Sequence, residues 1–390
     1  MDEYCAFRKA FYLVSHKHLI FKLEKYGIKN EILAWIASFL NQRSQRVVVR
    51  GTASEAFEVT SGVPQGSVLG PVLFLIFIND LPLGIISLLS LFADDTKVFR
   101  RIVADRSGQV QTSDRDREIL QNDLDNIYKW AEKWKMEFNV DKCKVMHLGR
   151  SNPGHTYTMG GRDLGVVTEE KDLGVWFDNQ LDFGKHIRSI VGRANRMLGL
   201  IKISFDCMDR EMFRNLYLVM IRPILEYCVQ VWCPYKQKDI DLIEQVQERA
   251  TRMVPGLKGM SYDERLKKLG IIRLVERRFR GDMIETHKIM SGREGVKRED
   301  FFQAAEERGD PSLARGKKIF KKRSNGLIRQ NTFSQRVVNP WNKLSKGEVM
   351  TETTSGFKSK FDGREKDTRR QVREENSGRG RLYKRLYEQW

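Results

Sequence analysis

The sequence has few of the residues that characterise cross-linked or fibrous proteins. Its 390 residues include only 5 cysteines and 9 prolines beside 30 glycines, which excludes a disulfide scaffold and a collagen-like chain. The cysteines are odd in number and lack close pairing, so we expect reduced thiols. They are Cys5, Cys143, Cys207, Cys228 and Cys233. No basic and then apolar signal segment follows Met1, which favours a nuclear or cytoplasmic protein that is not secreted.

A long uninterrupted hydrophobic run is also missing. The most apolar stretch, residues 68–93, is broken by Asn79, Asp80 and Pro82. The remaining runs are about ten residues long, whereas a membrane-spanning helix needs about 20. We therefore expect no membrane association, and we predict a buried helix followed by a buried strand.

Positive charge is abundant and unevenly distributed. The formal net charge is +18, of which residues 1–200 carry +3 and residues 201–390 carry +15. Such a field favours a polyanionic partner, most simply a nucleic-acid backbone. A basic surface that only keeps the protein in solution is the alternative.

Hydrophobic patterning predicts an α+β fold for residues 1–178. Helices are expected at residues 15–26, 30–40 and 114–135, with another after Gly66. The remaining apolar pieces alternate or form short runs, as in strands. They are residues 46–50 and 56–60, which form a hairpin around Gly51, and residues 88–93, 96–102, 143–148 and 173–178.

Residues 185–291 keep a helical period and predict a bundle. The expected helices are residues 187–203, 210–220, 224–232, 240–253 and 271–290. After residue 292 the pattern weakens, and the chain becomes a basic C-terminal region. Its tail, residues 363–390, carries nine Lys and Arg residues and is expected to be mobile.

Two short motifs carry the chemistry. Residues 61–71 read SGVPQGSVLGP, and residues 92–95 read FADD. An Asp pair at a hairpin turn places two carboxylates where they attract divalent cations. Taken singly, however, an Asp-Asp turn is usually a solvated bend, and Pro and Gly usually only shape a loop.

In this order, with an apolar helix between them, the two motifs resemble the reverse transcriptases of non-LTR (LINE-type) retrotransposons. Further similar segments are FRKAFYLVSHKHLI from Phe7, FNVDKCK from Phe138, DLGV from Asp172 and LYLVMIRPILEYCVQVW from Leu216. The resemblance implies an RNA-directed DNA polymerase that uses an RNA template, a DNA primer and two Mg²⁺ ions. It also implies a polymerase palm over residues 1–178, a thumb-like helical domain over residues 184–291, and the basic region over residues 292–390.

The same resemblance implies roles for individual residues. Asp94 and Asp95 would bind metal, and Lys142 would donate a proton to pyrophosphate. Contacts to nucleotide or template would come from Phe11, Pro64, Gln65, Gly66, Phe92 and Ala93. Leu173 and Gly174 would form the primer-grip turn. A core aromatic is the alternative for Phe11, and a surface lysine the alternative for Lys142.

The sequence departs from the family at the first palm motif. The family pattern D-F-x-K-A-F-D reads here from Ala6 to Tyr12, so the position of a metal-binding Asp holds Ala6. The chain also begins at this motif, and we expect the fingers region to be missing by truncation at the N-terminus. We therefore expect polymerase activity to be lost or weak. The alternative is a non-catalytic nucleic-acid-binding scaffold derived from a polymerase palm.

Nucleic-acid contacts are expected in the basic region. Its densest cluster is Lys317, Lys318, Lys321, Lys322 and Arg323, which is also compatible with a nuclear import signal or a solvated charge run. Nearby aromatic residues are candidates for stacking on bases. They are Phe320, Trp341, Tyr383 and Tyr387. Oligomeric state has no signature in the sequence.

Overall fold

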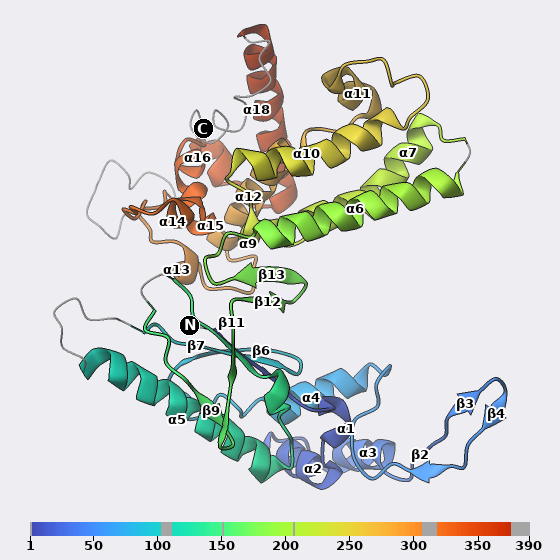
Figure 1. Ribbon diagram of the computed structural model, residues 1–390, viewed down its shortest axis with the longest axis vertical. Coiled ribbons are helices and arrows are strands. Elements are labelled where there is room, and N and C mark those ends of the chain that lie inside the picture. The colour runs from blue at the N-terminus through green and yellow to red at the C-terminus, as the bar shows by residue number, and fades with distance from the viewer. Residues whose placement is uncertain (1, 103–110, 150–151, 206, 306–317, 376–390) are drawn as a thin grey trace. The chain divides into compact units, whose positions relative to one another are not determined.

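The computed structural model describes residues 2–102, 111–149, 152–205, 207–305 and 318–375 (Figure 1). The chain divides into two compact units. Unit 1 contains residues 1–172 and 177–181, and unit 2 contains residues 173–176 and 182–390. Unit 1 mixes a sheet with helices, whereas unit 2 is mostly helical. The expected α+β class is confirmed.

A five-stranded sheet organises unit 1. Its order is β11-β8-β1-β7-β6, so β1 is the central strand. β1 runs antiparallel to both neighbours, and β11 joins β8 in parallel. The strands are β1 (Asp2–Ala6), β6 (Leu88–Phe92), β7 (Asp95–Phe99), β8 (Lys144–Met146) and β11 (Gly165–Val167).

The helices of unit 1 begin close to where the sequence predicts. The Ser15 hydroxyl caps α2 by accepting a bond from the His18 N–H, as its position before the apolar run suggests. The helices are α1 (Ala10–Leu13), α2 (His16–Lys25), α3 (Asn30–Leu40), α4 (Leu69–Ile78), α5 (Gln111–Trp134) and the short η1 (Val140–Lys142).

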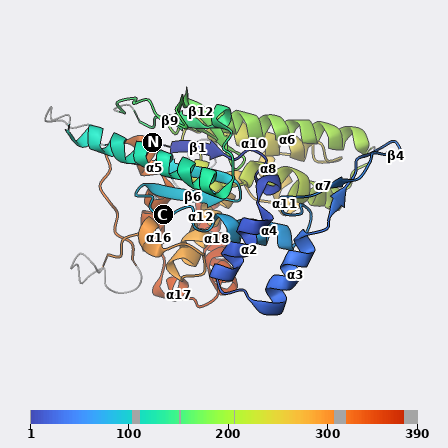
Figure 2. The same cartoon turned by 90° about the horizontal axis from the view of Figure 1, so that it is seen from below.

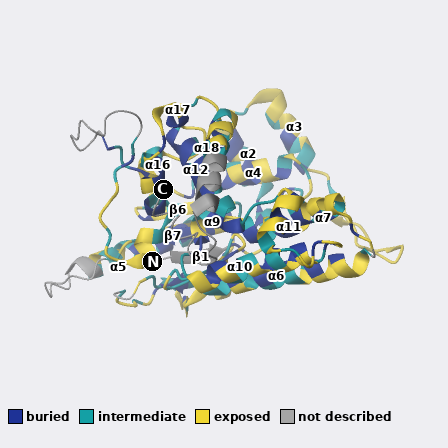
Figure 3. Ribbon diagram, turned by 90° about the horizontal axis from the view of Figure 1, so that it is seen from above, coloured by how far each residue is buried: buried dark blue, intermediate teal, exposed yellow. Residues whose placement is uncertain are grey.

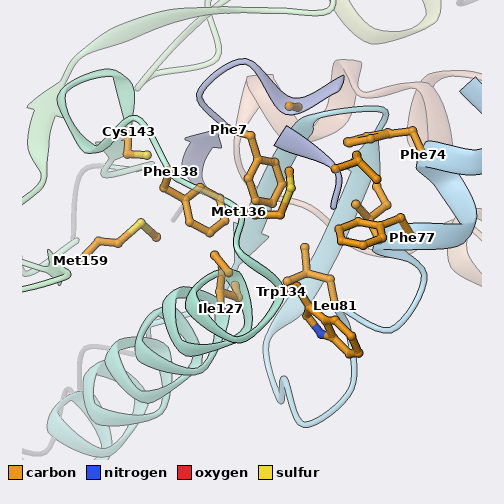
Figure 4. Packing of buried hydrophobic residues seen from close by; sticks show 14 of the residues in the cluster. Phe7, Phe74, Phe77, Leu81, Ile127, Trp134, Met136, Phe138, Cys143 and Met159 are labelled. Atoms are coloured by element: carbon orange, nitrogen blue, oxygen red, sulfur yellow. The ribbon is translucent and has the colours of Figure 1, made fainter. Parts of the chain in front are cut away.

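These helices and the sheet enclose one hydrophobic core that is rich in aromatic residues. α5 lies beside the strands (Figure 2) and shares a core with Val98 of β7 and Val145 of β8. Phe7 stacks on Phe138 with ring centroids 4.2 Å apart, and Phe77 meets Trp134 edge to face at 6.2 Å (Figure 4). The aromatic residues thus join the segment after β1 to α4 and α5.

The apolar stretch 68–93 forms α4 and β6. α4 is only 10 residues long, and no helix in the described ranges has the length and apolarity needed to cross a membrane. The prediction that residues 88–93 form a buried strand is wrong. β6 is an edge strand of the sheet, and its alternate residues Leu88 and Phe92 are 71% and 62% exposed.

A long hairpin leaves the helices of unit 1 as an arm, which we define as residues 43–59 (Figure 1). The predicted hairpin around Gly51 is confirmed, although its strands are short. Val47, Val48 and Val49 are each more than 60% exposed. The arm contains β2 (Ser44–Gln45), β3 (Val48–Val49), β4 (Thr52–Ala53) and β5 (Phe57–Glu58).

Short strands complete the N-terminal half of the chain. β9 (Thr158–Met159) pairs with β10 (Arg162–Asp163), and β12 (Glu169–Asp172) pairs with β13 (Val175–Asp178). The turn between β12 and β13 lies at the division between the units, because residues 173–176 belong to unit 2.

Unit 2 begins as a helical bundle whose long helices bury one face (Figure 3). The expected helix 224–232 is broken, because Cys228 adopts φ +57°. A further helix, α11, was not predicted and begins at a capping box of Ser261 and Glu264. The helices are α6 (Gly184–Ser204), α7 (Arg210–Leu216), a π-helix (Tyr217–Ile221), α8 (Arg222–Glu226), α9 (Val229–Trp232), α10 (Gln237–Arg252), α11 (Tyr262–Leu269) and α12 (Leu274–Met290).

Residues after α12 pack against it rather than extending into solvent. Trp341, Phe357 and Phe361 share a core with Phe279 and Met283 of α12. The expectation that Trp341 stacks on bases is wrong, because its side chain is 1% exposed. The helices here are α13 (Arg298–Phe301), α14 (Leu327–Asn331), α15 (Phe333–Arg336), α16 (Val338–Asn342), α17 (Lys346–Val349) and α18 (Thr354–Glu375).

The expected start of a mobile tail, residue 363, lies inside α18, whose backbone continues to Glu375. Tyr383 and Tyr387 lie outside the described residues, as does Lys317.

Candidate active site

The Asp pair lies at the turn of a tight hairpin. β6 and β7 are joined by Ala93 and Asp94, and Phe92 pairs with Asp95 across the turn. Ala93 has φ +52°, so the positive angle falls on the first of the two connecting residues, as in a type II′ turn. Glycine is preferred at that position, since a side chain there costs about 1–2 kcal/mol. The FADD turn therefore holds backbone strain beside its first carboxylate.

Ala93→Gly is expected to raise the free energy of unfolding by about 0.5–1 kcal/mol. Glycine removes the left-handed strain but also gives the unfolded chain more freedom, which offsets part of the gain. Denaturant unfolding of unit 1 measures the change. Ala56→Gly, in the exposed arm and without a positive φ, is the matched control and should show no gain. An equal gain in both variants would contradict the assignment of strain to Ala93.

Ala6 is placed directly opposite the Asp pair. The ladder between β1 and β7 pairs Ala6 with Asp95 and Cys5 with Thr96. Residues paired across an antiparallel ladder are about 4.5–5.5 Å apart at their Cα atoms. Position 6 is therefore where a further carboxylate would adjoin Asp95, and alanine supplies no oxygen there.

The charges around Asp95 explain its protonation behaviour. Partial burial and the neighbouring Asp94 carboxylate raise the pKa of Asp95, whereas Lys97 opposes the shift. Lys97 points from β7 into the protein, is 7% exposed and forms an ion pair with Asp172 at the end of β12. Proton affinity is thus higher at Asp95 than at an ordinary carboxyl, because its carboxyl group is partly buried and because Asp94 and Asp172 lie near it.

The SGVPQG segment lies against α1. The Val63 N–H donates to the Phe11 carbonyl at 2.8 Å, and the Tyr12 hydroxyl donates to Gln65 Oε1 at 3.3 Å. The Phe11 ring stacks on Phe74 of α4 with centroids 4.5 Å apart. Phe11 is therefore half-buried, while Gln65 remains exposed. The structure brings these two candidates together.

Glycines in this segment serve two different purposes. A Cβ atom at Gly62 would lie 2.9 Å from the Phe11 and Tyr12 carbonyl oxygens, and one at Gly70 would lie 2.2 Å from the Pro64 oxygen. Close backbone packing thus requires glycine at both positions. Gly66 instead has φ +82° and no heavy atom within 4 Å of a Cβ position. Its conformation, rather than crowding within the chain, accounts for the glycine.

Lys142 lies at the end of η1, and η1 packs beside β1. The preceding residues are held next to the end of β1, since the Arg8 N–H donates to the Glu137 oxygen at 2.7 Å. The Lys142 side chain is exposed, and among described residues it forms no ion pair. Its element is therefore close to the strand that carries Ala6, while its ammonium group remains available.

The expected primer-grip turn is strained. Leu173 has φ +41° and Gly174 has φ +90°, the pair of positive angles that a type I′ turn requires. Leu173 is unusual at such a position and is 42% exposed.

The basic cluster of unit 2 is mainly on the surface. Lys321, Lys322 and Arg323 are exposed, and Lys318 is half-buried. The Lys318 carbonyl accepts from the Ala305 N–H, and Ile319 forms an isolated bridge with Ala304. The exposed residues of the cluster thus come directly after a short extended segment that pairs with residues 304 and 305.

The acidic residues do not fit a two-metal centre. The reverse transcriptase family generally uses divalent metal ions, and a centre that holds two ions about 3.5–4 Å apart needs several ligating oxygens. Asp94 and Asp95 are adjacent, but the partner strand presents Ala6. Across the described ranges, no group of three or more Asp, Glu, His or Cys side chains could hold a metal ion.

Sequence reasoning missed several residues that shape this region. They are Tyr12, His16, Gly62, Lys97 and Asp172. His16 Nε2 lies 2.8 Å from the Gly62 carbonyl oxygen. A buried lysine in a strand, such as Lys97, needs a carboxylate partner, but the sequence does not say which one.

Comparisons with known proteins point to one family of enzymes. Residues 6–180 match the family model described as reverse transcriptase (RNA-dependent DNA polymerase). The chain is 30% identical over 269 residues to an RNA-directed DNA polymerase from mobile element jockey of Drosophila melanogaster, covering 64% of this chain and 28% of that protein.

Two other Drosophila melanogaster proteins are similar. A probable RNA-directed DNA polymerase from transposon BS is 28% identical, covering 65% of this chain and 29% of its own length. A probable RNA-directed DNA polymerase from transposon X-element is 26% identical, covering 65% of this chain and 28% of its own length. The chain thus spans less than a third of these relatives.

A solved telomerase structure from Candida albicans aligns with a TM-score of 0.34 and 12% identity, covering 70% of this chain and 51% of that chain. That score is too low to establish a shared fold. The motif order, the Asp hairpin and the family match together identify residues 6–180 as a reverse transcriptase domain similar to those of non-LTR (LINE-type) retrotransposons.

Proposed function

We propose that this chain binds an RNA template and a DNA primer as a reverse transcriptase does, but that its nucleotidyl transfer is impaired at the metal site. In this proposal residues 1–178 act as the palm, residues 184–291 as the thumb, and residues 292–390 as a basic region along nucleic acid. The observation that carries the impairment is the pairing of Ala6 with Asp95. The concentration of positive charge in residues 201–390 supports nucleic-acid binding.

Substrate contacts follow from the position of each candidate. Gln65 and Gly66 are exposed beside α1, where they would contact the template and the incoming nucleotide. Phe11 would limit the room beside the nucleotide sugar, since stacking on Phe74 fixes its ring. Phe92 and Ala93 immediately precede Asp94 in the hairpin. Lys142 would deliver a proton to the leaving group from its exposed position near β1.

Ala6→Asp is expected to tighten Mn²⁺ binding by about tenfold or more, because affinity for hard cations rises with the number of carboxylate ligands. The added carboxylate would come from the strand position opposite Asp95. Electron paramagnetic resonance of free Mn²⁺ measures the affinity for the unmodified chain and the variant. This readout does not depend on parts of the longer relatives that this chain does not span.

Ala6→Asn is the matched control, since it adds the same volume without the charge. Adding Asp94→Asn to Ala6→Asp should remove the gain. Equal Mn²⁺ affinity in Ala6→Asp and Ala6→Asn would refute the proposed site. Robust primer extension on an RNA template by the unmodified chain, with Mg²⁺ or Mn²⁺, would refute the impairment.

A further inference from the structure

We infer that Tyr227 is a positioning residue that fixes the turn Leu173–Gly174 for contact with the primer strand. The inference rests on the proposed function for its nucleic-acid part. It extends that proposal to a residue in the segment between α8 and α9, far from the turn in sequence. Both Tyr227 and residues 173–176 belong to unit 2.

The Tyr227 side chain makes two contacts with the turn. Its hydroxyl donates a hydrogen bond of 3.0 Å to the Leu173 carbonyl oxygen. Its ring edge lies 3.4 Å from the position that a Cβ atom would take at Gly174. One aromatic side chain therefore bonds to the first turn residue and covers the second.

Strained backbone lies on both sides of this hydrogen bond. Leu173 has φ +41°, and Cys228, the residue after Tyr227, has φ +57°. Neither residue is glycine, so each left-handed conformation costs about 1–2 kcal/mol. Such strain persists only where surrounding contacts determine the conformation, and it is concentrated at functional sites. The break at Cys228 separates α8 from α9, so Tyr227 lies between two helices rather than within one.

Tyr227 is itself held in place by buried contacts. Trp232 is 1% exposed, and its indole Nε1–H donates to the Tyr227 carbonyl at 2.7 Å. The Trp232 ring meets His186 edge to face, with centroids 4.9 Å apart. His186 Nδ1 accepts from the Trp176 N–H at 3.3 Å. The chain of contacts therefore starts at Leu173, passes through two buried rings and returns to Trp176.

Residues 173–176 are thus fixed at both ends by side chains of the helical unit. Lys185 adds a cation–π contact, with its ammonium 3.6 Å from the Trp176 ring centroid. In contrast to the buried anchors, Leu173 and Tyr227 are 42% and 57% exposed. A rigid support below two exposed side chains is the arrangement expected of a surface that fixes a ligand in place.

The test compares Tyr227→Phe, which removes only the hydroxyl, with Tyr26→Phe as a matched control. Tyr26 is 47% exposed and lies at the end of α2 in unit 1. Hydrogen–deuterium exchange of the peptide 170–178, without nucleic acid, reports on the turn itself. Tyr227→Phe should speed exchange by about fivefold, the factor expected for one net hydrogen bond, and Tyr26→Phe should not. Unchanged exchange in Tyr227→Phe would overturn the support role.

The second readout uses a primer–template whose primer ends in 4-thiothymidine. Photocross-linking to peptide 170–178 should fall several-fold in Tyr227→Phe, while the overall Kd changes less than twofold. Equal cross-linking in the unmodified chain and Tyr227→Phe would overturn the primer role alone. If the unmodified chain fails to bind the primer–template, the proposed function and the primer role both fail, while the exchange result still decides whether Tyr227 holds the turn.

A glycine variant separates positioning from general stability. Leu173→Gly relieves the positive φ without removing the Leu173 carbonyl. In that background the turn needs less support, and Tyr227→Phe should then change exchange by less than twofold. An undiminished effect would show that Tyr227 does not act through the strained turn.

Discussion

Replacing Arg336 with methionine is expected to lower the free energy of unfolding of unit 2 by about 3–5 kcal/mol. Arg336 of α15 forms a two-pronged ion pair with Asp282 of α12, at 2.7 and 2.9 Å. The two side chains are 5% and 0% exposed. Arg336 also donates to the carbonyls of Asn331 and Gln230. Methionine fills part of the space but leaves the Asp282 carboxylate and two carbonyls without these donors.

Urea unfolding of the variants measures this effect. Arg298→Met removes an exposed pair with Glu299 and should change stability by less than about 0.5 kcal/mol. A paired replacement, Asp282→Leu with Arg336→Met, should recover most of the loss because no charge is left buried. If Arg336→Met costs no more than Arg298→Met, the buried ion pair has no stabilising role.

Raising the pH from 8 to 10 is expected to stabilise unit 1 by about 2 kcal/mol through Lys22, at 1.36 kcal/mol for each unit of pKa difference. Lys22 is 3% exposed, and burial lowers its pKa from 10.5 to about 8, although Asp80 opposes the shift. Between pH 8 and 10.5 the unfolded chain therefore binds more protons at this lysine than the folded chain. Stability rises with pH in that window.

The Lys22 ammonium has an unusual environment that explains the effect. It donates to the Phe77 carbonyl at 2.6 Å and to Asp80 at 2.5 Å. It also lies over the rings of Phe77, Trp130 and Trp134, closest to Trp134 at 3.8 Å. These contacts stabilise the charged form but do not fully replace water.

Tryptophan fluorescence during denaturant unfolding follows this transition, because Trp130 and Trp134 adjoin Lys22. Lys22→Met should show no gain between pH 8 and 10. Above about pH 10 unit 2 should show the opposite trend, since burial raises the pKa of its residues Tyr217 and Tyr262 and the unfolded chain loses those protons earlier. A pH dependence identical in Lys22→Met and the unmodified chain would contradict the assignment to Lys22.

Local patterns predict much of unit 1. Ser15 predicts a helix start and caps α2, and the FADD turn joins two strands as expected. The comparison of FRKAFY with its family motif implies that Ala6 stands at a metal-ligand position, and the register puts Ala6 opposite Asp95. These features depend on neighbouring residues or on motif order, both of which a sequence displays.

Contacts between distant segments were not predictable in the same way. Trp341 lies among lysines in sequence but is buried by Phe279 and Phe357 from other helices. β6 is apolar except for Ser90, yet its place at the sheet edge exposes alternate residues. The hydrogen bond from Tyr227 to Leu173 joins residues 54 positions apart. In each case tertiary packing, which no local pattern encodes, determines the environment.

The arm, residues 43–59, has a consequence for how the protein behaves at high concentration. A strand at the edge of a sheet has unpaired backbone N–H and C=O groups along one side. When such a strand also exposes apolar side chains, it is a template for association between copies of the protein. The exposed valines 47–49 lie between Arg46 and Arg50, and charged neighbours of this kind act as gatekeepers by repelling a second identical strand. Because salt screens that repulsion, self-association through the arm should increase with ionic strength.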